Sequence, residues 1–149
     1  MTEIKKFSFA DKKLMNIAHM IRHEVFVIGQ NCPTHLEWEF EEDSTHFLVF
    51  DNNKAVATAR HRKTTKGYKL ERFAVLSNLR GKGYGHIVLK AILEDLKPNH
   101  NQEVLLYING FGGTPLMELY LLFNSSKKIL DQKNIKISRS LVGNFTTSL

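Results

Sequence analysis

Residues 77–85 read Ser77-Asn78-Leu79-Arg80-Gly81-Lys82-Gly83-Tyr84-Gly85. This stretch follows the strand-like run YKLERFAVL at 68–76, and apolar residues at helical spacing follow it as far as Leu96. A strand, a glycine-rich turn and an amphipathic helix in this order direct the free N–H groups of the first helical turn at whatever lies before the helix. The stretch therefore predicts an anion site for a phosphate-bearing ligand. The alternative is a tight strand-to-helix corner in which the glycines serve only the turn.

Two other phosphate motifs fit this stretch less well. A P-loop requires Gly-Lys followed by Ser or Thr, but Gly81-Lys82 is followed by Gly83. A dinucleotide fingerprint requires G-x-G-x-x-G and an acidic residue about 20 positions further on. Here the third glycine comes one residue early, and position 105 is Leu105.

The rest of the chain alternates between strand-like and helix-like patterns. Asp11 stands as an N-cap before a helix that ends near Gly29, and the turns at 52–53 and 66–67 link three strands into an antiparallel meander. The tail at 127–141 is compatible with one or two final strands. The order predicts an α/β (α+β) fold, a mixed sheet with helices packed on it. The expected strands are 3–9, 45–51, 54–63, 68–76 and 103–108. The later helices are one after Gly85, with apolar residues from Ile87 to Leu96, and one over 114–123.

Length and composition indicate one globular domain, 1–149. The 149 residues are 42% hydrophobic and 24% charged, which excludes the disordered and collagen-like classes and the large two-domain enzymes. The one cysteine, Cys32, cannot form an internal disulfide, and nearby acidic residues should raise the pKa of its thiol, so we expect a structural role. No export signal opens the chain and no apolar run approaches the roughly 18 residues of a membrane span, so the expected location is cytoplasmic.

The formal net charge of +6 indicates an anionic partner, which could be a nucleic acid, a membrane or a phosphorylated small molecule. The basic residues concentrate between Arg60 and Lys82, where Glu71 is the one acidic residue. An acidic collar precedes this basic span. It consists of Glu37, Glu39, Glu41, Glu42 and Asp43 around Trp38 and Phe40.

The sequence resembles the GCN5-related N-acetyltransferases (GNAT), and in particular their bacterial ElaA/YjcF-like branch. Arg80, Gly83 and Gly85 match the family signature [Arg/Gln]-x-x-Gly-x-[Gly/Ala]. The run from Ile21 to Pro33 resembles the opening helix and turn of that branch. The acidic collar and the segment Glu71-Arg72-Phe73-Ala74-Val75 are also similar to the corresponding segments of that branch. The resemblance covers roughly residues 4–140 and is strongest from 68 to 96.

This resemblance implies acetyl coenzyme A (acetyl-CoA) as donor and a primary amine as acceptor, with direct attack in a ternary complex. In GNAT folds the sheet is splayed between its fourth and fifth strands, where the pantetheine pairs with the fourth strand and the pyrophosphate lies on the glycine-loop amides. Arg80 and Lys82 are the candidates for side-chain contacts with phosphate. The coenzyme-binding residues so implied are Phe73, Ala74, Val75, Arg80, Gly81, Lys82, Gly83, Tyr84, Gly85 and His86.

The resemblance also suggests catalytic residues. The Val75 N–H is expected to hold the oxyanion, and Tyr120 matches the family's tyrosine that protonates the departing thiolate. Glu71 is expected to act as the base, directly or through a water molecule. The alternatives are a core tyrosine at 120, and an ordinary strand carboxylate at 71 that pairs with Arg60, Arg62 or Arg72.

The sequence suggests two opposite kinds of acceptor. In this family the acceptor pocket lies near the first helices, so the acidic collar could attract a cationic amine. Arg22 and Arg72 could instead hold a phosphate or carboxylate on the acceptor. The expected lining residues are Arg22, Glu39, Glu41, His46 and Arg72.

Two further interpretations compete with an acetyltransferase. A nucleic-acid-binding domain would use the basic span and aromatic strand residues such as Tyr68, but no helix-turn-helix, zinc or RNP pattern supports it. The second competing interpretation is a protein that binds the coenzyme without turnover. It remains open because Gly113 and Asn124 depart from the family pattern. His19 and His23 have metal-pair spacing without a third ligand, so no metal is expected. The expected partner is a small-molecule amine, without nucleic acid or membrane, and a homodimer is possible.

Overall fold

The computed structural model describes residues 1–99, 102–110 and 114–145. Its contacts divide the chain into two compact units, Met1–Ile92 and Leu93–Leu149, and each unit has its own sheet. Gly113 lies outside the described residues. The single domain expected over 1–149 stays a prediction.

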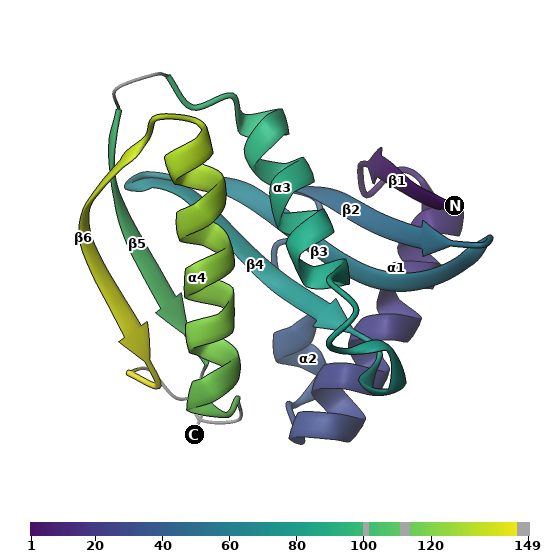
Figure 1. Ribbon diagram of the computed structural model, residues 1–149. Coiled ribbons are helices and arrows are strands. Elements are labelled where there is room, and N and C mark those ends of the chain that lie inside the picture. The colour runs from purple at the N-terminus through teal and green to yellow at the C-terminus, as the bar shows by residue number, and fades with distance from the viewer. Residues whose placement is uncertain (100–101, 111–113, 146–149) are drawn as a thin grey trace. The chain divides into compact units, whose positions relative to one another are not determined.

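The first unit contains a four-stranded antiparallel sheet with the strand order β1-β2-β3-β4 (Figure 1). The predicted meander is therefore confirmed. Asn52 and Asn53 connect β2 to β3 with positive φ values of 48° and 63°, a conformation that asparagine tolerates better than most residues. The strands are β1 (Thr2–Phe7), β2 (Ser44–Asp51), β3 (Lys54–Thr64) and β4 (Gly67–Val75).

One face of this sheet is covered by α1 (Lys12–Arg22). The helix begins where the sequence predicts, because the Asp11 carboxylate accepts a hydrogen bond from the Leu14 N–H at 3.0 Å. It continues as a π-helix, η1 (His23–Ile28), and the single-turn helix α2 (Thr34–Glu37) follows. The core that joins α1 to the sheet consists of Phe7, Met15, Ala18, Ile21, Val25, Leu48 and Ala74.

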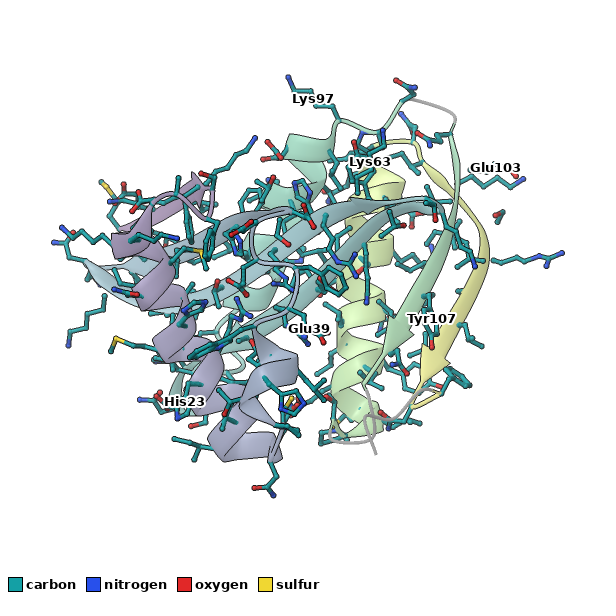
Figure 2. The ribbon with its side chains drawn as sticks, turned by 180° about the vertical axis from the view of Figure 1, so that it is seen from behind. His23, Glu39, Lys63, Lys97, Glu103 and Tyr107 are labelled. Carbon is teal, nitrogen blue, oxygen red and sulfur yellow. The ribbon has the colours of Figure 1, made fainter. Side chains whose placement is uncertain are left out.

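The glycine-rich stretch leads from β4 to a helix on the other face. A 3₁₀ turn, η2 (Ser77–Leu79), precedes α3 (Tyr84–Leu96), whose Val88, Leu89 and Ile92 are buried. Figure 1 shows α3 in front of the sheet and α1 behind it, and the reverse view in Figure 2 brings α1 and α2 to the front. The stretch thus carries the chain from the end of β4 around to the second face of the sheet.

The second unit is a βαβ arrangement of β5 (Glu103–Asn109), α4 (Leu116–Gln132) and β6 (Lys136–Gly143). β5 and β6 pair directly and in parallel. Parallel strands need a crossover connection, and α4 provides it. β4 and β5 belong to different sheets among the described residues, and the expected splay between them stays a prediction.

The sequence prediction was wrong about the end of α4. The helix does not stop near 123 but continues to Gln132, so the first six residues of the 127–141 tail, 127–132, are helical rather than extended. Polar residues at 124–126 interrupt the apolar pattern that marks a helix in the sequence. In the structure Ser126 is buried and its hydroxyl donates to the Leu122 carbonyl at 2.8 Å, while Ile129 and Leu130 continue the buried face.

The predicted fold class is confirmed. The chain has a mixed α+β architecture with an antiparallel sheet and flanking helices. None of the helices in the described ranges is both long enough and apolar enough to cross a membrane.

Candidate active site

The glycine-rich loop has a backbone conformation that requires glycine at two positions. Gly81 and Gly83 have φ values of +79° and +84°, in the left-handed region where a Cβ is disfavoured. Apart from its two chain neighbours, no described residue would lie within 4 Å of a Cβ built on either glycine, so the space beside this backbone is open. Two left-handed glycines on either side of Lys82 therefore leave the loop backbone open directly before α3.

Two side-chain contacts hold the ends of this loop. The Tyr84 hydroxyl donates a hydrogen bond to the Asp51 carboxylate at 2.7 Å, which ties the start of α3 to the end of β2 and raises the pKa of Tyr84. The Arg80 Nε donates to the Val75 carbonyl at 3.3 Å. The role of Asp51 was missed from the sequence, because nothing local connects positions 51 and 84. Among the other expected coenzyme residues, Lys82 and His86 are exposed.

β4 contains a bulge immediately before the residues expected to pair with the coenzyme. The β3–β4 register shifts between Thr58, which faces Ala74, and Arg60, which faces Glu71. The extra residue on β4 leaves Arg72 with a φ of +59°, an unusual conformation for a side-chain-bearing residue. A bulge re-aims the backbone groups that follow it, and here those groups are the ones from Phe73 to Val75.

Buried charges connect the acidic collar to the strands. One oxygen of Glu41 accepts hydrogen bonds from Arg22 at 2.7 Å and from Arg60 at 2.8 Å, and the other lies 3.0 Å from His19 Nε2. Arg22 and Arg60 are each only 1% exposed. Burial alone would raise the pKa of Glu41, but the hydrogen bonds from His19 and Arg22 and the charges of Arg22 and Arg60 outweigh it and lower the pKa to about 2.

The contacts of Glu71 match the alternative interpretation, in which it is a strand carboxylate held in ion pairs. Its Oε1 accepts hydrogen bonds from Arg60 at 2.9 Å and Arg62 at 2.8 Å, and Lys69 lies 3.1 Å from Oε2. Burial opposes ionisation of Glu71, but these cations prevail and lower its pKa. A carboxylate stabilised as its anion is a weaker proton acceptor, so these contacts favour a strand ion pair over a general base at this position. Its catalytic role stays a prediction.

The residues expected to line an acceptor pocket do not share one environment. Arg22 and His46 are each 1% exposed, and His46 Nε2 lies 2.9 Å from the Glu41 carbonyl, so both side chains are shielded from solvent. Glu39 is exposed. Arg72 is partly buried and donates to the Leu36 carbonyl at 2.7 Å. Of the five expected residues, only Glu41 lines the surface hollow beside the acidic collar.

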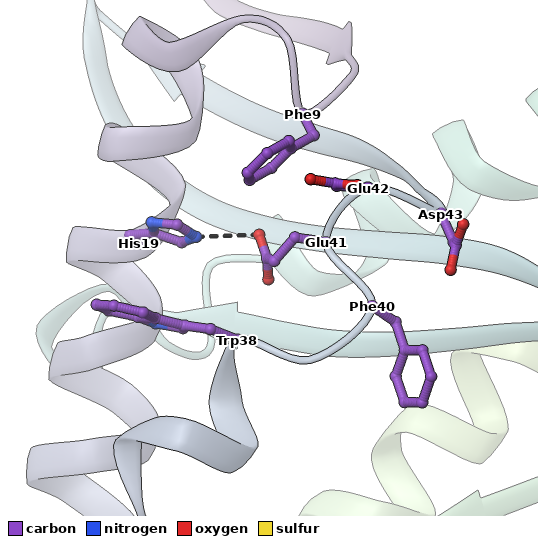
Figure 3. A pocket seen from close by; sticks show the side chains of 7 residues that line it. All are labelled: Phe9, His19, Trp38, Phe40, Glu41, Glu42 and Asp43. Atoms are coloured by element: carbon purple, nitrogen blue, oxygen red, sulfur yellow. Dashed lines mark hydrogen bonds and ion pairs between the residues drawn. The ribbon is translucent and has the colours of Figure 1, made fainter.

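A surface hollow of about 550 Å³ lies where the acidic collar meets α1 (Figure 3). The Trp38 indole stacks on the His19 ring with centroids 4.9 Å apart, and these two rings form one wall. In the part of the chain that the structure describes, no ion pair or hydrogen bond reaches the side chains of Glu42 and Asp43. The lining residues are Phe9, His19, Trp38, Phe40, Glu41, Glu42 and Asp43.

The remaining expectations concern Tyr120 and Cys32. Tyr120 lies on α4 in the second unit and is 50% exposed, so the alternative of a buried core tyrosine is wrong. Burial and the charge of Glu37 raise the pKa of the Cys32 thiol against the opposing effect of Arg72, as the acidic surroundings predict. Across residues 1–99, 102–110 and 114–145 no three His, Cys, Asp or Glu side chains group as metal ligands.

Comparison with known proteins identifies the family. A family model of the acetyltransferase (GNAT) domain matches residues 9–109, which include the bulged strand and the glycine loop. The chain belongs to the GNAT family. The uncharacterized N-acetyltransferase YjcF of Bacillus subtilis is 42% identical to it over 76 residues, which are 50% of this chain and 54% of YjcF. This GNAT chain therefore spans about half the length of that relative.

Solved structures support the same fold. Escherichia coli ElaA has a TM-score of 0.56 at 26% sequence identity, over 64% of this chain and 69% of ElaA. An acyl-CoA N-acyltransferase from Pseudomonas aeruginosa has a TM-score of 0.57 at 23% identity, over 65% of this chain and 71% of that chain, and shows the fold alone. The expected ElaA/YjcF-like membership is thereby confirmed.

The C-terminal half also matches a second family. A model of the Dak1 domain matches residues 74–149, so this half belongs to that family as well and overlaps the GNAT match at 74–109. The dihydroxyacetone-binding subunit DhaK of a Listeria innocua dihydroxyacetone kinase is 36% identical over 62 residues, 42% of this chain and 19% of that subunit. Tyr120 lies beyond the GNAT match and within the Dak1 match.

The lowered pKa of Glu41 predicts a loss of stability in acid. Because its folded pKa of about 2 is below the ordinary value of 4.5, the carboxylate stabilises the fold above pH 4.5, and this contribution disappears as the pH falls toward 2. The contribution at neutral pH is on the order of 3 kcal/mol. Urea unfolding at a series of pH values should show a steeper acid loss for the parent than for Glu41→Gln. Glu24→Gln, at an exposed carboxylate, is the control and should keep the parent slope. Equal slopes for the parent and Glu41→Gln would contradict the prediction.

Proposed function

We propose that this GNAT chain binds acetyl-CoA at the glycine loop and β4, and transfers the acetyl group to a primary amine that is cationic in solution. The observation that carries this proposal is the pair of left-handed glycines, Gly81 and Gly83, beside open space and directly before α3. In a chain that matches the GNAT model, this geometry fits one localised pyrophosphate.

The residues of the first unit fit the coenzyme. The open backbone of Gly81 and Gly83 leaves room for phosphate oxygens to approach the loop amides, and Lys82 is exposed beside them. Charge-assisted hydrogen bonds are stronger than neutral ones, so an exposed cation adds to what the amides contribute. A coenzyme A complex is known for an aminoglycoside 6'-N-acetyltransferase with a TM-score of 0.52 to this chain at 14% identity. The coenzyme supplies an acetyl group activated as a thioester.

The reaction needs a neutral amine, a stabilised oxyanion and a proton for the thiolate. The amine nitrogen forms a bond to the acetyl carbon, the carbon–sulfur bond breaks, one amine proton leaves to a base and the sulfur takes up a proton. In this proposal the Val75 N–H donates to the oxyanion, a role that its place after the β4 bulge supports. Tyr120 is proposed as the proton donor to sulfur. Glu71, whose pKa is lowered by its three cations, is proposed to take up that proton directly or through a water molecule.

The charge arrangement supports a cationic acceptor over an anionic one. Arg22 is buried and bound to Glu37 and Glu41, so it has no exposed donor for an acceptor phosphate or carboxylate. The hollow instead offers the carboxylates of Glu42 and Asp43, which no other described residue binds, beside aromatic rings. Carboxylates and aromatic faces both attract ammonium groups. The hollow is connected to β4 through the buried chain of contacts from Glu41 to Arg60 to Glu71.

The DhaK relatives supply no second function for this chain, because it covers only 19% of the Listeria innocua subunit and 29% of the Lactococcus lactis subunit. The nucleic-acid alternative predicts binding that follows charge alone and disappears with salt. The calorimetric experiment below separates it from coenzyme binding.

Gly83→Val should abolish the binding of acetyl-CoA. Its Cβ would force a left-handed residue out of its conformation and occupy the space proposed for the pyrophosphate. Gly67→Val is the matched control, because Gly67 also has a positive φ and open space but is the first residue of β4, next to the β3–β4 turn. Calorimetric titration at two salt concentrations, with ATP as a phosphate control, measures both. Stoichiometric binding that only Gly83→Val removes supports the site, whereas weak binding equal to that of ATP and lost in salt would overturn it.

Tyr120→Phe should lower kcat by about 10²–10⁴ if the tyrosine protonates the thiolate, because general acids contribute rate factors of this size. Coenzyme binding should be unchanged, since only one hydroxyl is removed. Steady-state kinetics with a saturating amine, together with the calorimetry above, provide both values. Full turnover of Tyr120→Phe would show that the proton comes from another group.

The double variant Glu42→Gln/Asp43→Asn should raise the KM for a cationic amine about tenfold and leave kcat nearly unchanged, because the two carboxylates would attract the substrate without contacting the reacting atoms. The effect should shrink at high salt. Glu3→Gln/Glu24→Gln removes two exposed carboxylates elsewhere and is the control. A preference for acceptors that carry a carboxylate, or an unchanged KM in the double variant, would contradict a cationic acceptor at this hollow.

A further inference from the structure

Glu37 is a fully buried carboxylate for which the reaction above has no use. It is the last residue of α2, and its side chain is 0% exposed. Arg22 donates hydrogen bonds from Nε to Glu37 Oε1 and from Nη2 to the Glu37 carbonyl. Placing a charge in a protein interior is costly, and a buried ion pair is often no more stable than apolar residues of the same volume. The position of Glu37 therefore calls for an explanation other than stability.

The other partner of Glu37 is the bulge residue of β4. Arg72 Nε lies 3.4 Å from Glu37 Oε2, and Arg72 Nη2 donates to the Leu36 carbonyl at 2.7 Å. The side chain of Arg72 thus contacts both the side chain and the backbone of the C-terminal end of α2. We name these contacts of Arg22, Glu37, Leu36 and Arg72 the α2 clamp.

The conformation at Arg72 needs such an anchor. A left-handed residue in a strand bulge is ordinarily glycine, because a Cβ disfavours this region. The strand is fixed on both sides of the bulge, since Glu71 is bound by Arg60 and Arg62, and the Leu76 N–H donates to the Val56 carbonyl at 3.3 Å. The contacts at Glu71 and Leu76 fix the two ends of the segment and therefore the number of residues between them. They do not fix the conformation of the extra residue, Arg72, whose side chain is the one that the clamp binds.

We propose that the α2 clamp holds Arg72 in its left-handed conformation and so positions the backbone of Phe73–Val75 for acyl transfer. Glu37 and Arg72 are then positioning residues, since they act through the strand backbone. The inference rests on the proposed function in one respect, that the amides after the bulge contact the thioester. The clamp also gives the acidic collar a structural role, because one of its members fixes the shape of β4.

Three substitutions separate conformation from chemistry. Arg72→Ala removes the clamp and leaves a Cβ in a left-handed position, so kcat/KM for acetyl-CoA should fall about tenfold or more, as expected when reacting groups are displaced. Arg72→Gly also removes the clamp, but glycine adopts the left-handed conformation freely and should recover most of that loss. Lys63→Ala removes an exposed cation from the neighbouring strand and should change nothing.

Glu37→Gln tests the clamp from its other end. It should lower kcat/KM in the parent but add little in the Arg72→Gly background, because the contact that it weakens is already absent. Hydrogen exchange of the amides at 72–75 gives a readout that needs no activity. Exchange there should be faster in Arg72→Ala and in Glu37→Gln than in the parent, while the amides of β1 stay protected.

The outcomes distinguish this inference from the proposed function. If the parent neither binds acetyl-CoA nor turns it over, the proposed function fails, and the exchange data still decide whether the clamp fixes the bulge. If Arg72→Gly is folded and as impaired as Arg72→Ala, the Arg72 side chain itself acts in the reaction and the positioning role is overturned. Unchanged exchange and unchanged kcat/KM in Arg72→Ala would also overturn it.

Discussion

The shared carboxylate of Glu41 is the contact on which the first unit depends. It accepts hydrogen bonds from Arg22 of α1 and Arg60 of β3, while Arg60 also binds Glu71 of β4. One acidic side chain thereby fixes a helix and two strands around a loop that has little regular structure of its own. Because these charges are buried, loss of one partner leaves another uncompensated, which costs more than a surface ion pair contributes.

The proposed chemistry uses backbone held in unusual conformations. Gly81 and Gly83 open the loop before α3 through left-handed geometry that glycine adopts without strain, whereas Arg72 reaches the same region of conformational space with a side chain. The two solutions suit different tasks. Glycine leaves room for a ligand beside the chain, while an anchored arginine holds one conformation of a strand whose amides must be aimed.

Most residues of the proposed active site lie in one of the two family matches. The glycine loop, the β4 bulge and the hollow all lie within the GNAT match, whereas Tyr120 lies only in the Dak1 match. In the second unit β5 pairs directly with β6 in parallel through α4. The proposed coenzyme-binding groups therefore lie in the first unit, whereas the proposed proton donor lies on α4 of the second unit.

The sequence by itself determined the order of elements, the Asp11 cap and the glycine loop, because periodicity, capping and glycine conformation act over a few residues. It offered an ion pair of Glu71 only as an alternative, and it did not reveal that Arg22 and Glu37 are buried together or that Asp51 binds Tyr84. It also placed the end of α4 too early, since only packing shows that Ser126 belongs to a buried face. Tertiary structure decided these points, because burial and ion pairing join residues far apart in the chain, and local patterns do not encode which charges leave the surface.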